Sequence, residues 1–238
     1  MLKTILFDLD GTLLPINTEK FIKMYFDELG IKFKEYFEKE EFAGLIWKAT
    51  ETMIGSKDPK KSNMEVFFEY FYNKSQHGKE IIDPLFEDFY IREFLKIEEL
   101  TERNIYIQKS IALLKDKGYE LVIATNPLFP KVAVDHRIQW AGLDREDFIL
   151  VTTFEDMHFC KPNTNYYKEI LEKINRNPKE CMMVGNDVEE DMVAGELGFK
   201  TYLIEDHKIQ RGENINNIDY VGKYQDFYKF VQNLPIIK

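Results

Sequence analysis

The chain has 238 residues, of which 44% are hydrophobic and 31% are charged, and its formal net charge is −10 at pH 7. This length allows one large domain, or a core domain with a smaller insertion. The negative charge argues against nucleic acid as a partner, because phosphate backbones are bound mainly by clustered Lys and Arg. No apolar run approaches the roughly 18 residues of a membrane span, so we expect no membrane helix.

The first residues and the cysteines indicate the compartment. The N-terminal segment lacks the basic flank, the long apolar core and the small-residue cleavage site of a secretory signal, so we expect a cytoplasmic protein. Cys160 and Cys181 have neither zinc nor redox spacing. We interpret both as reduced, small hydrophobic side chains without a chemical role.

The chain opens with a short apolar run over residues 3–9, which stops at Gly11 and predicts a fully buried strand. After Pro15, apolar residues recur at helical spacing from residue 17 to about residue 97, which predicts an all-helical block of about four helices. We expect its breaks at Gly30 and over residues 55–63 and 77–84. Most aromatic residues of this block should form the core of a small bundle, and a few are available to line a pocket.

From about residue 101, helices and strands alternate. The predicted elements are a helix ending at Lys117 before Gly118, a strand over 119–125, a helix after Pro130, a strand over 148–153, a helix over 163–175, a strand over 180–187, a short helix ending near Gly198, a strand over 200–205 and a closing helix over 223–234. This alternation predicts an α/β fold with a doubly wound parallel sheet. The predicted boundaries are 1–15 and 100–238 for the α/β core and 16–99 for the inserted helical domain.

Polar residues follow four predicted strands, at the sheet edge where ligands bind in open parallel sheets. They are Asp8 and Asp10, Thr125 and Asn126, Lys161, and Asp187 and Asp191. Each alone has an ordinary interpretation: a turn cap for Asp10, a turn hydroxyl for Thr125, a solvated lysine for Lys161. Their coincidence at one edge favours a common site.

The acids of this group have the chemistry of a cation site. Because residues i and i+2 of a strand face the same side, the side chains of Asp8 and Asp10 should start on one side. With Asp187 from a neighbouring strand they would make an all-oxygen cluster suited to Mg²⁺. Gly11 offers a loop where backbone amides can approach an anion closely.

Four short motifs in these positions resemble those of the haloacid dehalogenase-like hydrolase superfamily, most closely its phosphatases. They are DLDGT at 8–12, ATN at 124–126, CKP at 160–162 and GNDVEED at 185–191. The resemblance covers nearly the whole chain if the helical block is the cap that these enzymes insert after the first motif. It implies a Rossmann-like core carrying a helical cap.

The resemblance also implies a role for each motif residue. Asp8 would be the nucleophile that forms an aspartyl-phosphate, and Asp10 would protonate the leaving oxygen and then activate water. Thr125 and the amides of Asn126 and Gly11 would bind the phosphoryl oxygens. Lys161 would neutralise charge on the nucleophile and the phosphoryl group.

Magnesium is the implied cofactor. Asp8, the backbone carbonyl of Asp10, and Asp187 would hold it, with Asp191 behind these ligands. The fourth motif departs from a usual form, because Asn186 stands directly after the glycine where Asp is common, and Asp187 follows it. We therefore choose Asp187 as the metal ligand and leave open whether Asn186 or Asp191 contacts the metal's surroundings.

The predicted function is a magnesium-dependent phosphatase acting on a small phosphorylated metabolite, with the cap closing over the site. A phosphomutase of the same superfamily and a non-catalytic metal- or phosphate-binding regulatory protein are the alternatives. A dehalogenase is disfavoured by Asp10, because an expelled halide needs no proton. The sequence identifies neither the substrate, nor the cap residues that select it, nor the oligomeric state.

Overall fold

The computed structural model describes residues 1–212 and 217–237, and a six-stranded parallel sheet lies at its centre. The strands are β1 (Thr4–Phe7), β2 (Glu120–Ile123), β3 (Leu150–Val151), β4 (Cys181–Gly185), β5 (Lys200–Ile204) and β6 (Tyr220–Gly222). Their order is β3-β2-β1-β4-β5-β6. The chain runs outward from β1 to β3 and returns to place β4 beside β1. This reversal makes the carboxyl ends of β1 and β4 the topological switch point, where ligands bind in such sheets.

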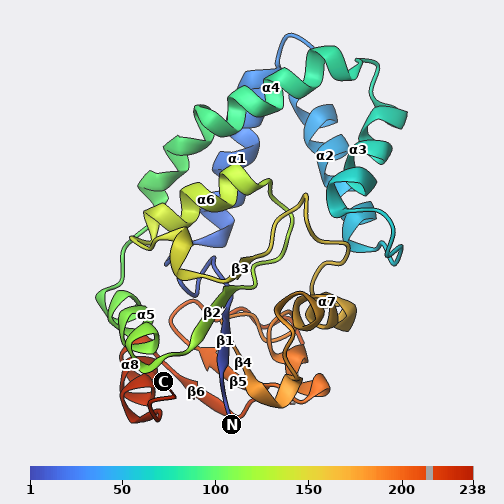
Figure 1. Cartoon of the computed structure of the whole chain (residues 1–238). Helices are drawn as coiled ribbons and strands as arrows, with labels where there is room; N and C mark the ends of the chain where they lie inside the picture. The colour runs from blue at the N-terminus through green and yellow to red at the C-terminus, as the bar shows by residue number, and fades with distance from the viewer. Residues whose placement is uncertain (213–216, 238) are drawn as a thin grey trace.

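Helices cover both faces of the sheet, as Figure 1 shows. Ile5 and Phe7 of β1 belong to the same hydrophobic cluster as residues of α5 (Ile105–Lys117) and α8 (Tyr224–Asn233). Leu6, which points the other way, belongs to a second cluster with α7 (Thr164–Ile174). The apolar runs are therefore explained by strands buried on both faces. The predicted doubly wound α/β fold is confirmed.

Four helices and one 3₁₀ segment lie between β1 and α5 and form a separate block above the sheet in Figure 1. They are α1 (Thr18–Phe33), α2 (Lys39–Ile54), α3 (Asn63–Lys74), α4 (Lys79–Ile91) and η1 (Glu93–Leu100). The expected number of helices is confirmed. The block has an aromatic core, in which Phe33 stacks on Phe42 with ring centroids 4.5 Å apart.

One predicted break in this block is wrong, and another is shorter than predicted. Gly30 lies inside α1, where a Cβ atom would come within 2.9 Å of the Lys39 side chain. This glycine therefore allows close packing at the start of α2 and does not end the helix. The break expected over 77–84 covers a shorter segment, because α4 begins at Lys79 and includes Pro84. Burial of Ile82, Phe86 and Phe89 offsets the helical hydrogen bond that a proline cannot donate.

The remaining elements follow the prediction with four differences. α5 ends at Lys117 before Gly118, which adopts φ 91°, and α6 (Lys131–Trp140) follows Pro130 as expected. The short helix before Gly198 is a 3₁₀ segment, η4 (Met192–Leu197), and β3 has only two residues. β6 was not predicted, because three residues are too few for a periodic signal. β1 ends at Phe7 instead of residue 9.

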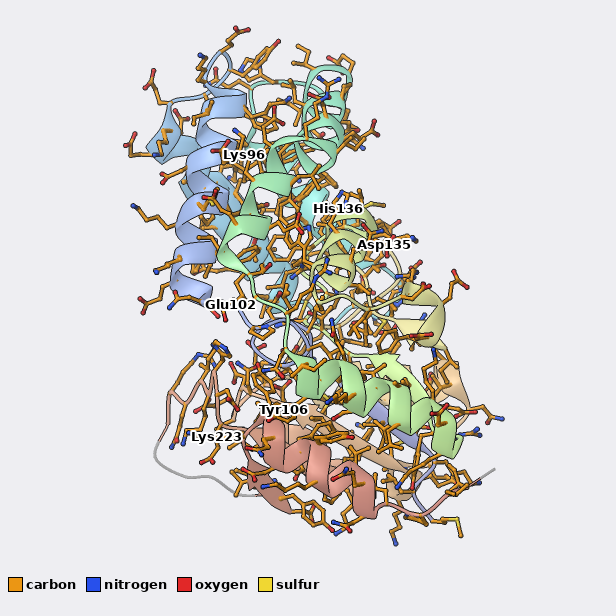
Figure 2. The ribbon with its side chains drawn as sticks, turned by 90° about the vertical axis from the view of Figure 1, so that its left-hand side faces the viewer. Lys96, Glu102, Tyr106, Asp135, His136 and Lys223 are labelled. Atoms are coloured by element: carbon orange, nitrogen blue, oxygen red, sulfur yellow. The ribbon has the colours of Figure 1, made fainter. Side chains whose placement is uncertain are left out.

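The chain passes from the sheet to the helical block near Pro15 and returns near Glu102, and these two crossings lie side by side. Ile16 forms an antiparallel bridge with Thr101, and the Glu102 amide donates to the Pro15 carbonyl at 3.1 Å. Glu102 lies at the narrowing between the block, which carries Lys96, and the part with Tyr106 and Lys223 (Figure 2). This pairing supports the proposed division of the chain at 15/16 and 99/100, which stays a prediction.

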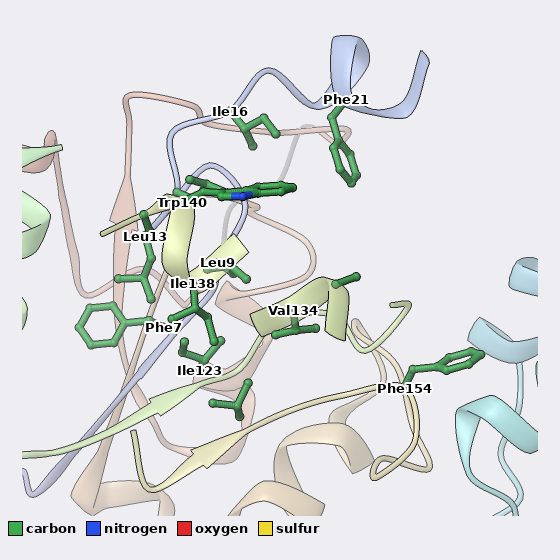
Figure 3. Close-up of a cluster of buried hydrophobic side chains, with 14 of the residues drawn as sticks. Phe7, Leu9, Leu13, Ile16, Phe21, Ile123, Val134, Ile138, Trp140 and Phe154 are labelled. Carbon is green, nitrogen blue, oxygen red and sulfur yellow. The ribbon is translucent and has the colours of Figure 1, made fainter. Parts of the chain in front are cut away.

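α6 joins the block to the sheet. Trp140 at its end stacks on Phe94 of η1, with ring centroids 5.5 Å apart. Figure 3 shows Trp140 and Ile138 packed with Leu13 and Ile16 from the segment that follows β1. The loop after the first strand, α6 and the block therefore share one hydrophobic cluster.

Both cysteines are buried free thiols, as interpreted from the sequence. Burial raises the pKa of Cys181 to about 12 and also raises the pKa of Cys160. In the described ranges, no helix combines the length and the apolar character needed to cross a membrane.

Candidate active site

Asp8 is the first residue after β1 and lies at the switch point. Its amide donates to the Val184 carbonyl of β4 at 2.9 Å, and its side chain is largely buried. The next residues form a tight turn, in which the Leu14 amide donates to the Leu9 carbonyl at 2.8 Å. Asp10 therefore lies in this turn and not in an extended strand. The strand geometry expected for the two acids is absent, because β1 ends at Phe7, but both acids line the same cavity as expected. Each carboxylate has its own cationic partner.

The partner of Asp8 is Lys161. The Lys161 ammonium donates to Asp8 Oδ1 at 2.9 Å and to Asp191 Oδ1 at 2.6 Å, and the side chain is 1% exposed. Burial by itself lowers the pKa of Lys161, but the carboxylates of Asp191 and Asp8 raise it well above its ordinary value. Lys161 is thus a buried cation between two acids and not a solvated lysine.

Asp191 supports this arrangement from the fourth motif. Its Oδ2 accepts from the Asp187 amide at 2.9 Å, and the side chain is fully buried. Burial raises the pKa of the Asp191 carboxyl, and the Lys161 ammonium opposes the shift. A Cβ atom at Gly185 would lie 2.0 Å from Asp191 Oδ2, so only glycine fits at the end of β4. Asp191 therefore fixes both Lys161 and the backbone at Asp187.

The partner of Asp10 is Arg137, which was not predicted. Arg137 of α6 is 1% exposed, forms an ion pair with Asp10 Oδ2, and lies 4.6 Å over the Phe129 ring. Burial raises the pKa of Asp10, whereas Arg137 opposes that shift. The other carboxylate oxygen, Asp10 Oδ1, is buried and has no hydrogen-bond partner among the described residues. That oxygen remains available to a group entering the site.

The sequence held one signal for Arg137. Ala133, Arg137 and Trp140 are spaced to share one face of α6, and all three are buried. An arginine on a buried helix face needs an acid partner, because an unpaired buried charge is costly. This reasoning predicts that an acid exists but does not identify Asp10, since the pairing depends on how α6 packs.

The second motif follows β2. The Thr125 carbonyl accepts from Thr152 Oγ1 at 2.7 Å and from the Tyr166 hydroxyl at 2.8 Å, which fixes the loop. The Asn126 side chain accepts from the Lys161 amide at 3.2 Å and donates to Glu190 Oε2 at 3.0 Å. Asn126 thus ties the second, third and fourth motifs together, a role of its side chain that was not predicted.

Asn186 ties the first motif to a distant loop. Its Oδ1 accepts from Thr12 Oγ1 at 3.0 Å, and its Nδ2 donates to the His207 carbonyl at 2.7 Å. Gly11 has φ +81°, and a Cβ atom there would lie 2.4 Å from Asn186 Nδ2. The Gly11 carbonyl accepts from the Tyr224 hydroxyl at 3.0 Å, a contact that was also not predicted. The side-chain amide of Asn186 is engaged in holding these loops.

We expect Gly11→Ala to lower the free energy of unfolding by about 2 kcal/mol, because alanine is strained at this φ and its Cβ displaces Asn186. Gly44→Ala is the matched control, since that glycine lies in α2 with no atom within 4 Å of its Cβ position. The control should gain about 0.5–1 kcal/mol. Denaturant unfolding of both variants measures the difference, and equal effects would contradict the strain at Gly11.

The predicted metal ligands are only partly free. Asp187 Oδ1 accepts from the amides of Glu189 and Glu190 at 3.1 and 3.0 Å, and Asp187 Oδ2 lies 2.8 Å from Arg211 Nη1. In the described part of the chain, no three His, Cys, Asp or Glu side chains form a group that could hold a metal ion. The predicted ligand set has only two carboxylate side chains and one backbone carbonyl, so the absence of such a group does not test it. The metal site therefore stays a prediction. Its all-oxygen chemistry fits Mg²⁺.

These residues open into one large cavity of about 980 Å³ between the strand ends and the helical block. The predicted site residues that line it are Asp8, Asp10, Thr125, Asn126, Asp187 and Asp191. Lys161 and Gly11 lie behind this surface and contact it through Asp8 and the turn. The structure thus brings together the candidates from all four motifs.

A fold and motif set of this kind define a class of hydrolase. The family model described as haloacid dehalogenase-like hydrolase matches residues 2–197, and the chain belongs to this family. The chain is 26% identical over 204 residues to pyrophosphatase PpaX of Bacillus cereus, covering 85% of this chain and 83% of that protein.

Solved structures have the same fold. The HAD phosphatase from Thermococcus onnurineus superposes with a TM-score of 0.60 at 21% identity, covering 99% of this chain and 100% of the other. The magnesium-bound HAD-hydrolase YfnB from Bacillus subtilis superposes with a TM-score of 0.58 at 18% identity, covering 98% and 99%. The resemblance carried by the four motifs is therefore confirmed.

Proposed function

We propose that this hydrolase is a magnesium-dependent phosphatase that cleaves a small phosphate monoester through an aspartyl-phosphate. The observation that carries the proposal is the separation of the two acids in one cavity. Asp8 is paired with the buried Lys161 cation, whereas Asp10 is held by Arg137 and keeps Oδ1 free. Two carboxylates with different surroundings suit a nucleophile and an acid-base group.

In the proposed reaction, a carboxylate oxygen of Asp8 attacks phosphorus, and the bond between phosphorus and the ester oxygen breaks. The leaving oxygen takes a proton from Asp10 and departs as an alcohol. Water then attacks the phosphorus of the aspartyl-phosphate, gives a proton to Asp10 and releases phosphate, which restores Asp8. Arg137 orients the Asp10 carboxyl throughout, and Lys161 offsets the charge at Asp8.

Mg²⁺, when bound, supplies positive charge beside the transferring phosphoryl group. Asp8, Asp187 and the Asp10 carbonyl are its proposed ligands. Arg211 already places a cationic group against Asp187, which supports this carboxylate as a cation partner. Thr125 and the amides of Asn126 and Gly11 are the proposed phosphate donors. The expected place of action is the cytoplasm, on small molecules and not on nucleic acid.

A screen of sugar, nucleotide and amino-acid phosphates tests this proposal. We expect phosphate release that requires MgCl₂ and stops with a chelator. Release of an isomeric phosphate ester without free phosphate would instead identify a phosphomutase, and halide release from haloacids a dehalogenase. Absence of turnover across the whole panel, despite bound Mg²⁺, would contradict the phosphatase and favour the regulatory alternative.

A further inference from the structure

The cavity over Asp8 reaches far beyond the volume that a phosphoryl group fills. Its 980 Å³ extends from the strand ends to residues of α1, α2, α3 and α4, including Trp47 and Tyr72. A site that only cleaves phosphate from a small polar group does not need this extension. The rest of the cavity lining is therefore expected to contact the group to which the phosphate is attached.

That wall is aromatic. Eleven Phe, Tyr and Trp side chains line the cavity in the described part of the chain. Phe68 of α3 stacks on Tyr72 with ring centroids 5.6 Å apart and meets Phe154 edge-on at 6.0 Å. Trp47 of α2 is 50% exposed although it lines the cavity. A large aromatic side chain left exposed beside a cavity offers a flat surface for stacking.

The charge of the wall is negative. The described lining residues include ten carboxylates and two cations, Lys79 and Arg211. Two buried cations behind the lining, Lys161 and Arg137, pair with Asp8, Asp191 and Asp10, so acids still outnumber the cations. Arg211 is engaged with Asp187 at 2.8 Å, and Lys79 lies 5.4 Å over the Tyr72 ring. Beyond the strand-end acids the lining carries further carboxylates on α3 and α4, among them Glu87 and Glu69, of which Glu69 is paired with Lys61. A second phosphate next to the scissile one would meet like charges in this cavity.

From this combination we propose that the substrate is a phosphate monoester whose leaving group is aromatic and carries no negative charge of its own. The inference rests on the proposed phosphatase function and deepens it. Stacking against Trp47 and Phe68 holds the leaving group, and the surrounding carboxylates reject polyanions. The site consequently disfavours inorganic pyrophosphate, the substrate class in the name of the Bacillus relative.

Four synthetic substrates distinguish the effects of the size, the aromaticity and the charge of the leaving group. Ethyl, benzyl and 2-naphthylmethyl phosphate release alkoxides of similar basicity, so their intrinsic reactivities are matched. We expect kcat/KM to rise at least about tenfold from ethyl to 2-naphthylmethyl phosphate, because the naphthyl ring buries more apolar area and stacks on the aromatic wall. 4-Carboxybenzyl phosphate should react at least about tenfold more slowly than benzyl phosphate. Pyrophosphate should be cleaved less efficiently than 2-naphthylmethyl phosphate, despite its better leaving group.

A variant pair tests the stacking itself. Trp47→Ala should lower the ratio of kcat/KM for 2-naphthylmethyl over ethyl phosphate by about tenfold. Tyr220→Ala is the control, because Tyr220 is an exposed aromatic residue of β6 outside the cavity lining. Its ratio should equal that of the wild type. An unchanged ratio in Trp47→Ala would overturn the proposed stacking.

Binding separates this inference from the proposed function. 2-Naphthylmethylphosphonate cannot be hydrolysed, and calorimetry should show it binding at least about tenfold more tightly than ethylphosphonate. If no ester is hydrolysed but this preference holds, the phosphatase proposal fails and the aromatic ligand class stands. If ethyl phosphate or pyrophosphate is cleaved in an Asp8-dependent way as efficiently as the naphthyl ester, the aromatic class is overturned and the phosphatase stands. Equal affinity for both phosphonates would also overturn the aromatic ligand class.

Discussion

Asp8→Asn is expected to reduce magnesium-dependent phosphate release by about 10⁴-fold or more, because a neutral amide oxygen does not replace a carboxylate nucleophile. The variant should still fold, since Asn matches Asp in shape and Lys161 keeps Asp191 as its partner at 2.6 Å. Phosphate release and the unfolding midpoint measure the two effects separately. Intact-mass analysis of acid-quenched protein should show a phosphorylated chain in the wild type and none in the variant.

The matched control for this variant is Asp226→Asn. Asp226 is an exposed carboxylate of α8 that pairs with Lys229 at 3.1 Å, away from the cavity. This variant should keep the wild-type rate. A rate for Asp8→Asn that stays within about tenfold of the control would rule out Asp8 as the nucleophile.

Lys161→Met is expected to lower the free energy of unfolding by about 3–5 kcal/mol in addition to lowering activity. The substitution leaves Asp8 and Asp191 buried without their shared cation, and such unpaired charges are costly. Urea or guanidinium unfolding at neutral pH measures the loss. Adding Asp191→Asn to Lys161→Met should recover part of the stability, since it removes one uncompensated charge.

Lys229→Met is the comparison for this prediction. Lys229 also pairs with an aspartate, but both side chains are more than half exposed, so the loss should be much smaller than for Lys161→Met. Similar losses of unfolding free energy for Lys161→Met and Lys229→Met would show that burial does not make the Lys161 ion pairs more important for stability than an exposed pair.

Hydrophobic periodicity was sufficient for most of the architecture, because every strand except β6 includes a short apolar run and the helices of the inserted block repeat their apolar residues at helical spacing. The strand-end rule then brought Asp8, Thr125 and Asp187 to one edge without knowledge of the strand order. Failures occurred where a residue's role depends on its neighbours in space. Gly30 has the appearance of a helix end, yet it lies inside α1, where the Lys39 side chain packs against it.

The same limit applies to the site. The strand-end rule placed Lys161 at the same sheet edge as the acids, but its burial between Asp8 and Asp191 could not be read from the sequence and involves the loop that Asn126 contacts. The pair between Arg137 and Asp10 joins residues 127 positions apart and follows from the packing of α6. Interactions of this kind have no local signature, so the sequence indicates which residue types take part, and the fold determines which of them pair.

The side-by-side crossings at Pro15 and Glu102 have a consequence for how this chain can diversify. Because the two backbone segments are already within hydrogen-bond distance, the helical block is joined covalently to the core at one place, and it also packs on α6. Its replacement by another block, or by a short turn, requires no stretching of the sheet. The residues at the strand ends can stay in place while the helical block is exchanged as a unit.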